Sequence, residues 1–145
     1  MNERFRHWEY PKFDECGMTK WGWMCQYRNN LNLGFNTDIG AFTYINAEYG
    51  VEIQDNAKIG SNCSIYSLST IDNKKGYVII KKYASIGSHS VIMPGVIVGE
   101  NSIIGAFSFV NKDIPDSVLA YGIPVKIVRK LTAKEIKKGL GGAGL

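Results

Sequence analysis

The sequence predicts an all-β fold, a β-solenoid of hexapeptide repeats followed by a short C-terminal helix. Aliphatic residues stand six apart without a slip through the second half of the chain: Ile80, Ile86, Ile92, Val98, Ile104 and Val110. A serine recurs at the fifth place of three hexads: Ser90, Ser102 and Ser108. An amphipathic helix would need apolar spacings of three and four, which this stretch lacks. Each hexad is therefore expected to be one short strand and a corner, stacked on the hexads of neighbouring coils.

The same spacing continues upstream in two shifted registers. The first register contains Leu33, Ile39, Ile45 and Val51, and the second contains Ile53, Ile59, Ile65 and Ile71. The two registers are offset by two residues, and Ile80 follows Ile71 after nine residues instead of six. We expect the three extra residues to loop out, so that the segment 72–77 projects from a corner of the solenoid.

The length of the chain suits one domain, which we divide into three parts. Residues 1–30 lie outside the repeat and are expected to cap the first coil, as solenoids require, although their aromatic residues also suit a wall for an acceptor substrate. Residues 31–111 form the solenoid, and residues 112–145 form a C-terminal segment. In that segment Thr132 and Glu135 have the spacing of a capping box that begins a helix, and the glycine-rich end is expected to be disordered.

Composition excludes several classes of protein. No apolar run is long enough to span a bilayer, and the first ten residues lack the apolar stretch of a signal peptide. The three cysteines, Cys16, Cys25 and Cys63, show no metal-ligand spacing, and their odd number is typical of reduced cytosolic thiols. A net charge of +4 is too small to indicate nucleic acid as a partner. We therefore expect a cytoplasmic protein that neither enters membranes nor binds nucleic acid.

The stretch from Ile86 to Ala106 resembles the hexapeptide-repeat acyltransferases, as do the Asn-Lys-Asp-Ile-Pro sequence ending at Pro115 and the Gly-Ile-Pro-Val-Lys-Ile-Val-Arg sequence ending at Arg129. The resemblance is greatest to the galactoside and maltose O-acetyltransferases, with their nucleotide-amino-sugar acetyltransferase relatives. It covers the segment 31–131. It implies a left-handed parallel β-helix, a homotrimer with active sites between subunits, and acetyl-CoA as the acetyl donor.

The resemblance also implies which residues contact coenzyme A. The family's contacts fall on Ser88, Ala106, Asn111, Lys112 and Arg129. Lys126 adds to the positive charge near Arg129, which suits the phosphates of coenzyme A because Arg binds phosphate bidentately and Lys acts as a point charge. The small side chains of Ser88 and Ala106 leave room for an extended pantetheine arm. The alternative is that the basic residues are ordinary solvated surface.

One residue of the family pattern is missing. In the O-acetyltransferases a catalytic histidine precedes the projecting loop, and the matching position here is at or near Thr70. His89 is the fourth residue of its hexad and is expected to point outward, in one column with Glu48, Leu68 and Phe107 and one coil from the loop. An unperturbed imidazole has a pKa of about 6.5, which suits a general base, so His89 is the candidate catalytic residue. It is equally compatible with a corner residue that only contacts coenzyme A or the acceptor.

The missing histidine favours an amine acceptor. A sugar hydroxyl needs a proton acceptor as it attacks, whereas an amine needs only to be neutral. The predicted function is acetyl transfer to an amino group of a sugar, expected to be a nucleotide-linked deoxy amino sugar of surface glycan or lipopolysaccharide biosynthesis. The candidates for binding the acceptor are Asn46, Glu48, Tyr66, Thr70 and Asp72, and Asp72 would attract an ammonium group. Ordinary solvation of these side chains is the alternative.

Other functions compete with this prediction. The first is O-acetylation of a sugar hydroxyl with His89 as the base, and the second is a solenoid that binds coenzyme A without catalysis. A zinc enzyme of the carbonic anhydrase kind needs three protein ligands, but the only histidines are His7 and His89, which are expected to lie far apart. We therefore expect no metal. A sugar nucleotidyltransferase would need a large N-terminal domain, for which residues 1–30 are too short.

Overall fold

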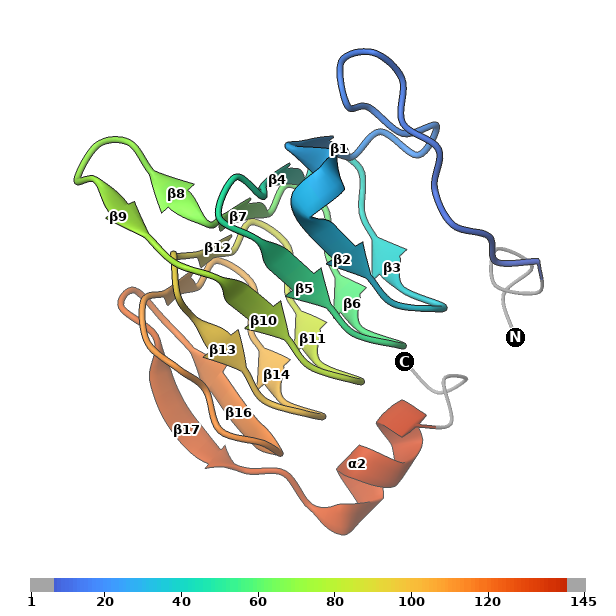
Figure 1. The fold of residues 1–145 in the computed structure, drawn as a ribbon. Helices are drawn as coiled ribbons and strands as arrows, with labels where there is room; N and C mark the ends of the chain where they lie inside the picture. Colours follow the sequence, from blue (N-terminus) through green and yellow to red (C-terminus); the bar gives the residue numbers. More distant parts are fainter. Residues whose placement is uncertain (1–6, 141–145) are drawn as a thin grey trace.

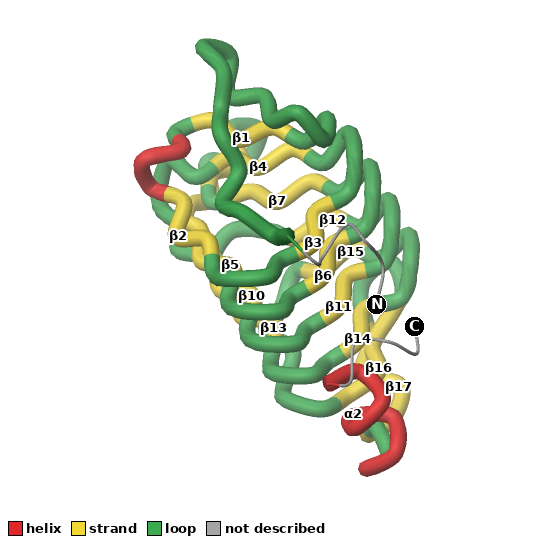
Figure 2. Tube along the Cα trace, turned by 90° about the vertical axis from the view of Figure 1, so that its right-hand side faces the viewer, coloured by secondary structure: helices red, strands yellow, loops and turns green. Residues whose placement is uncertain are grey.

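The computed structural model describes residues 7–140, and both the first six residues of the N-terminal cap and the glycine-rich end, 141–145, lie outside the described residues. Over the described part the chain winds as a left-handed parallel β-helix with one C-terminal α-helix, which confirms the predicted fold class (Figures 1 and 2). The hexads become two- or three-residue strands, and successive strands lie on three different faces.

Each face of the solenoid is one sheet. Sheet 1 contains β1 (Met24–Gln26), β4 (Tyr44–Asn46), β7 (Ser64–Tyr66), β12 (Val91–Ile92) and β15 (Phe109–Val110). Sheet 2 contains β2 (Leu31–Leu33), β5 (Val51–Ile53), β10 (Val78–Ile80) and β13 (Ile97–Val98). Sheet 3 contains β3 (Asp38–Ile39), β6 (Lys58–Ile59), β11 (Ser85–Ile86), β14 (Ile103–Ile104), β16 (Val118–Tyr121) and β17 (Lys126–Lys130). Pairing between coils is parallel, and β17 adds to β16 in antiparallel fashion at the sheet edge.

The aliphatic residues of the repeat form the core. Cα partners along sheet 1 are Cys25, Ile45, Ile65, Ile92 and Val110, all of which are buried. In a strand successive side chains point to opposite faces, so one buried residue per short strand is enough to fill the interior. Burial of aliphatic side chains on both neighbouring coils is what holds the stack together.

The small residues at the fifth place satisfy buried backbone groups at the corners. The Ser102 hydroxyl donates to the Pro115 carbonyl and accepts the Val118 N–H at 3.1 Å. The Thr43 hydroxyl likewise binds two backbone groups of the following coil: it donates to the Gly60 carbonyl at 2.8 Å and accepts the Cys63 N–H at 3.1 Å. A buried backbone group without a partner is costly, which explains why hydroxyl residues recur at this place.

The coils between β4 and β15 differ in length at one corner only. Ile45 pairs with Ile65, Ile65 pairs with Ile92, and Ile92 pairs with Val110. The last of these coils is made of three plain hexads. The first has two extra residues at the corner after sheet 1, which is the predicted register offset. The middle coil is the longest, because it carries the projecting segment at the same corner.

The projecting segment is longer than predicted, and Ile71 does not belong to the core. The chain leaves the coil after Ser67 and forms an antiparallel hairpin of β8 (Leu68–Ser69) and β9 (Lys74–Lys75), which extends from the body of the solenoid (Figure 1). Ile71 is 98% exposed near its tip. The expectation that Ile71 continues the repeat and that the loop begins at residue 72 was therefore wrong, because the chain leaves the coil after Ser67, although the coil resumes at Val78 as predicted.

The first and last elements of the described residues join the coils of the solenoid. A 3-10 turn, η1 (Arg28–Asn30), connects β1 to β2. At the other end the parallel pairing continues past residue 111, since β16 pairs with β14. The final helix, α2 (Ala133–Leu140), begins with the predicted capping box: the Thr132 N–H donates to Glu135 Oε1 at 3.0 Å, and the Glu135 N–H donates to Thr132 Oγ1 at 3.2 Å.

Candidate active site

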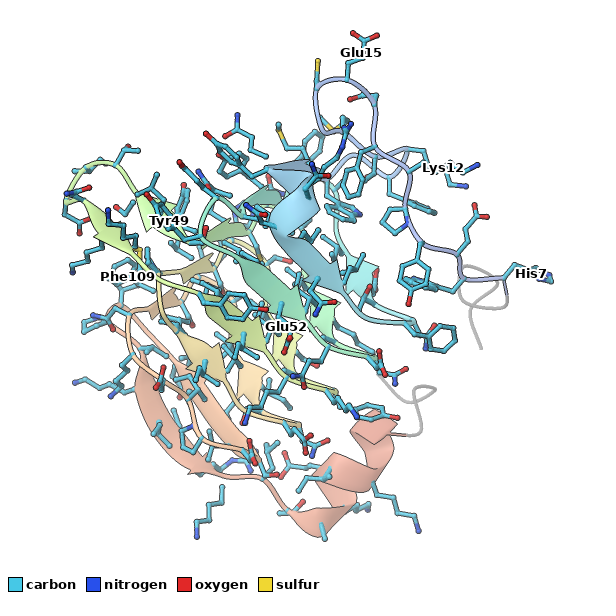
Figure 3. All side chains as sticks on the ribbon, in the orientation of Figure 1. His7, Lys12, Glu15, Tyr49, Glu52 and Phe109 are labelled. Atoms are coloured by element: carbon cyan, nitrogen blue, oxygen red, sulfur yellow. The ribbon has the colours of Figure 1, made fainter. Side chains whose placement is uncertain are left out.

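A groove of about 540 Å³ lies between the outer face of sheet 1 and the β8–β9 hairpin. Four of the five residues predicted to bind the acceptor line it: Asn46, Tyr66, Thr70 and Asp72. The other lining residues are Gln26, Tyr44, Leu68, Ser69, Ile71, Val91, Met93 and Phe109. Figure 3 shows Phe109 on the same side of the molecule as the hairpin. Glu48 is not among the lining residues, and its backbone carbonyl accepts a hydrogen bond from Asn30 instead.

The floor of the groove is fixed by hydrogen bonds between side chains of sheet 1. Tyr44 and Tyr66 flank buried isoleucines, so their rings point outward, and their centroids lie 5.9 Å apart. The Tyr44 hydroxyl donates to Gln26 Oε1, and Asn46 Nδ2 donates to the Tyr44 oxygen at 3.5 Å. Burial raises the pKa of Tyr44, which keeps the phenol neutral and able to donate. Asn46, only 9% exposed, also accepts the Glu48 N–H at 3.1 Å.

Asp72 supplies the negative charge at the hairpin. Its carboxylate accepts the Lys74 N–H at 3.4 Å and forms an ion pair with Lys74 Nζ at 3.6 Å. The Ser69 hydroxyl, which hydrogen-bonds to the carboxylate, lowers the pKa of Asp72 further below its ordinary value. Asp72 is therefore ionised at neutral pH, which suits a group that attracts a cation better than one that accepts a proton. Because Asp72 is exposed, any ammonium group must compete with Lys74 and with water for it.

His89 lies at the opposite end of the sheet 1 strands from the hairpin. Its backbone N–H donates to the Ser61 carbonyl at 3.0 Å, and the Phe107 N–H donates to the Ser88 carbonyl at 3.0 Å. The column at this corner therefore contains Phe42, Asn62, His89 and Phe107, which share a positive φ of 65°, 58°, 62° and 59°. The His89 and Phe107 rings are stacked, with centroids 4.8 Å apart and an interplanar angle of 3°.

The predicted column of Glu48, Leu68, His89 and Phe107 was thus wrong in its first two members. Glu48 and Leu68 follow sheet 1 strands, whereas His89 and Phe107 precede them. The hexad count treated Ile71 as the next core position after Ile65, which gave the coil with the hairpin one strand too many and moved the upstream residues to the other end of the sheet. His89 is consequently not beside the hairpin, and neither His7 nor His89 lines the groove.

The residues predicted to contact coenzyme A fall in three places: the two ends of sheet 1 and, for Arg129, the part of β17 beside α2. Ser88 and Ala106 lie at the His89 corner in consecutive coils, where the backbones approach so closely that a Cβ on Gly87 would lie 2.4 Å from the Ala106 nitrogen. Lys126 is near them, since it pairs with Tyr121, whose side chain packs on Gly105. Asn111 and Lys112 follow β15, so they lie at the other end of sheet 1.

Arg129 is held by α2. Its guanidinium binds Glu135 bidentately, with Nη1–Oε1 at 2.8 Å and Nη2–Oε2 at 3.0 Å. Glu135 and Ile136 also line a slot of about 340 Å³ against sheet 3, whose floor includes Gly60 and Gly87. The slot is therefore bounded by the residues next to Ser88 and by the partner of Arg129. An exposed, basic β17 and a corner of small side chains fit a polyanionic ligand with a thin amide arm.

The structure adds two site residues that the sequence did not single out. Tyr44 and Gln26 fix the floor of the groove, and Tyr44 was detectable because it flanks Ile45 in the alternating pattern, as Asn46 does. Within residues 7–140 no group of three or more His, Cys, Asp or Glu side chains is placed to hold a metal ion. No helix in the same range is long and apolar enough to cross a membrane.

Known protein families match the repeat. The model of the family described as "Bacterial transferase hexapeptide (six repeats)" matches residues 77–112, and that of "Hexapeptide repeat of succinyl-transferase" matches residues 32–67. The galactoside O-acetyltransferase of Escherichia coli (strain K12) is 35% identical over 118 residues, which are 75% of this chain and 58% of that protein.

Two further comparisons concern an amino-sugar enzyme and a bound ligand. The dTDP-3-amino-3,6-dideoxy-alpha-D-galactopyranose 3-N-acetyltransferase of Aneurinibacillus thermoaerophilus is 56% identical over 52 residues, 36% of this chain and 27% of that protein. A solved structure of galactoside acetyltransferase in complex with coenzyme A superposes with a TM-score of 0.70 and 31% identity, over 78% of this chain and 60% of that chain. The chain thus spans little more than half the length of the Escherichia coli relative.

Proposed function

This chain is a hexapeptide-repeat protein homologous to the galactoside acetyltransferases, and from that premise we propose that it transfers the acetyl group of acetyl-CoA to a sugar. The solved galactoside acetyltransferase contains coenzyme A, which supports the choice of donor. Two features of this chain fit the same donor: the small side chains at the Ser88–Ala106 corner and the exposed basic strand β17.

The acceptor that the groove supports best is an amino group of a nucleotide-linked deoxy amino sugar, as used in surface glycan biosynthesis. The observation that carries this proposal is the lining of the groove, where the ionised Asp72 lies with Asn46 and Tyr66 but without either histidine. The relative from Aneurinibacillus thermoaerophilus, named for a dTDP-linked amino sugar, supports the same class. In this proposal such precursors are made in the cytoplasm, and the protein acts there.

The chemistry of an amine acceptor agrees with this lining. The amine nitrogen forms the new C–N bond, the thioester C–S bond breaks, and the proton that the nitrogen loses goes to water or to the leaving thiolate. No side chain has to remove a proton before attack, in contrast to a hydroxyl acceptor. In the proposal Asp72 attracts the ammonium form of the acceptor, which loses one proton to water before the neutral amine attacks, and the Tyr44–Asn46 network orients the sugar.

The two separate groups of donor-binding residues support assembly as a homotrimer. Ser88, Ala106 and Lys126 lie at one end of sheet 1, and Asn111 and Lys112 lie at the other end. In the proposal one coenzyme A molecule contacts the first group on one subunit and the second group on a neighbouring subunit. In the same proposal Arg129 releases the Glu135 carboxylate and binds a phosphate of coenzyme A in its place.

The experiment that tests the function measures thiol release from acetyl-CoA. The acceptor panel contains a dTDP-linked amino sugar, free glucosamine and methyl galactoside, and the proteins are wild type, Asp72→Asn and His89→Ala. We expect turnover with the amines only. Asp72→Asn should raise KM for the amino sugar about tenfold, because the amide keeps the shape of the carboxylate but loses its charge-assisted hydrogen bond to the ammonium group.

Two comparisons make the result decisive. Glu15→Gln changes a carboxylate to an amide on the N-terminal loop, away from the hairpin (Figure 3), and should leave KM unchanged. His89→Ala should retain at least about a third of the wild-type kcat, since loss of a general base typically costs about 10²-fold or more. Turnover with methyl galactoside that disappears in His89→Ala would instead establish O-acetylation with His89 as the base.

A further inference from the structure

A second pocket lies at the N-terminal end of the solenoid, separate from the groove on sheet 1. It has a volume of about 200 Å³ and shares none of the groove's lining residues. Its floor is the corner between sheets 2 and 3 of the first coil, with Leu33, Thr37 and Ile39. Its walls come from two segments outside the repeat: residues 7–11 and residues 20–23.

The walls are aromatic, and two of the indoles are packed by rings that do not line the pocket. Trp23 is only 3% exposed and packs edge-on against Phe13, with centroids 5.5 Å apart. Trp8 donates its indole N–H to the Thr37 carbonyl at 2.9 Å and is packed edge-on by Phe35 at 5.3 Å. Because these partners already hold the rings, the walls are in place before any ligand binds, which lowers the entropy cost of binding.

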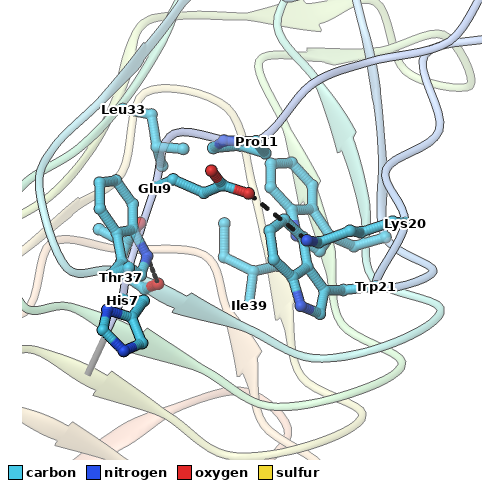
Figure 4. Close-up of a pocket in the computed structure, with 10 residues that line it drawn as sticks. His7, Glu9, Pro11, Lys20, Trp21, Leu33, Thr37 and Ile39 are labelled. Atoms are coloured by element: carbon cyan, nitrogen blue, oxygen red, sulfur yellow. Dashed lines mark hydrogen bonds and ion pairs between the residues drawn. The ribbon is translucent and has the colours of Figure 1, made fainter. Parts of the chain in front are cut away.

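The rim of the pocket carries one charge of each sign. Glu9 and Lys20 form an exposed ion pair at 3.4 Å, and the Lys20 ammonium lies 4.6 Å from the centroid of the Trp21 ring. Figure 4 shows Ile39 between Thr37 and Trp21, with the ion pair spanning the space beside them. The two charges cancel, and the place over Trp21 that attracts a cation is already taken by Lys20. The pocket therefore disfavours cationic and strongly anionic ligands.

We propose that this pocket binds a single pyranose ring of a neutral sugar. A pyranose has an apolar C–H face that packs on an aromatic ring, and hydroxyls at its edge that donate to a carboxylate and accept from an ammonium group. The pocket offers the indole of Trp21 for the face once the exposed Lys20 side chain turns off the ring, and it offers Glu9 and the released Lys20 ammonium for the edge. Its volume lies below the roughly 300–1,000 Å³ of pockets for drug-sized ligands, so it suits one ring and not a nucleotide.

The tryptophans make this site directly observable. The chain has three tryptophans, and all three line the pocket. The test is a titration of intrinsic tryptophan fluorescence, with calorimetry in parallel, using the methyl glycosides of glucose, galactose and N-acetylglucosamine. We expect a saturable change with at least one glycoside. Trp21→Ala should weaken its binding about tenfold, or about 1.4 kcal/mol, and Glu9→Gln about fivefold.

Controls separate the site from general effects and from the groove. Tyr66→Phe changes the groove only and should leave glycoside binding unchanged. If Trp21→Ala does not fold by circular dichroism, the exposed Glu9→Gln variant carries the test. The absence of a saturable change with all three glycosides would overturn the proposal, as would unchanged binding in Glu9→Gln. Since binding and not turnover is measured, a failed transferase assay leaves this result standing.

Discussion

The coils of the solenoid repeat the same positions, whereas the segments that leave the coils are each unique. Within the coils each place is occupied again and again, so that His89 holds the same corner position as Phe42, Asn62 and Phe107. The departing segments have no such counterparts, yet each one closes a cavity against the coils. The hairpin closes the groove on sheet 1, the N-terminal segment closes the aromatic pocket, and α2 closes the slot on sheet 3. The coils provide the flat wall of each cavity, and the departing segments provide the opposite wall.

The contrast is tested most strongly by two isoleucines six residues apart. Ile65 is fully buried in a coil, and Ile71 is 98% exposed on the hairpin. Ile65→Ala should lower the free energy of unfolding by about 2–5 kcal/mol, because it leaves a cavity between coils. Ile71→Ala should change it by less than about 0.5 kcal/mol. Urea unfolding of both variants measures this, and comparable losses would show that Ile71 is a core residue after all.

The hydroxyls inside the corners give the next largest effect. Ser102→Ala should cost about 1–3 kcal/mol, since it removes the partner of the buried Val118 N–H and of the Pro115 carbonyl. Ser64 points outward from β7, so Ser64→Ala is the matched control and should stay within about 0.5 kcal/mol. Thermal and urea unfolding report the difference. An equal effect of the two substitutions would contradict a structural role for the corner hydroxyls.

The attachment of α2 to the coils gives the smallest effect and depends on pH. Arg129 lowers the pKa of Glu135 from 4.5 to about 2. A lowered folded-state pKa stabilises the fold above the unfolded-state value, and this stabilisation is lost as pH falls from 4.5 toward 2. Glu135→Gln should therefore reduce the midpoint of thermal unfolding slightly at neutral pH and have no effect at a pH near the lowered pKa. A difference that persists unchanged at that acidic pH would exclude the ion pair as its cause.

Much of the solenoid was predictable because its information is local and repeated. A six-residue spacing identifies Ile86, Ile92 and Val98 as buried without any knowledge of distant contacts. The same spacing runs by coincidence from Ile65 to Ile71, which has left the coil. For this reason Ile71 was misplaced, and His89 was aligned with Glu48 and Leu68. Both errors come from the single corner, after sheet 1, where the coils differ in length.

The groove was partly predictable for a related reason. Asn46 and Tyr66 were identified because outward positions in a strand alternate with buried ones, and Thr70 and Asp72 because they lie beside the interruption of the repeat. For the aromatic pocket, the sequence suggested an aromatic wall from residues 1–30 but not where that wall lies. It depends on how residues 7–11 and 20–23 cross the first coil, and neither segment has a period that fixes its position.

The hairpin also bears on how the chain folds. Each strand pairs with the strand one coil further along the chain, so closing a turn of the solenoid joins residues that are three hexads apart in sequence. Where the hairpin is inserted, this sequence separation is half as large again. Loop-closure entropy grows only with the logarithm of loop length, and the longer coil therefore costs only about 0.4 kcal/mol more to close. Coil formation should propagate across the insertion at nearly the rate of its neighbours, and substitutions at the hairpin tip should change catalysis without slowing folding.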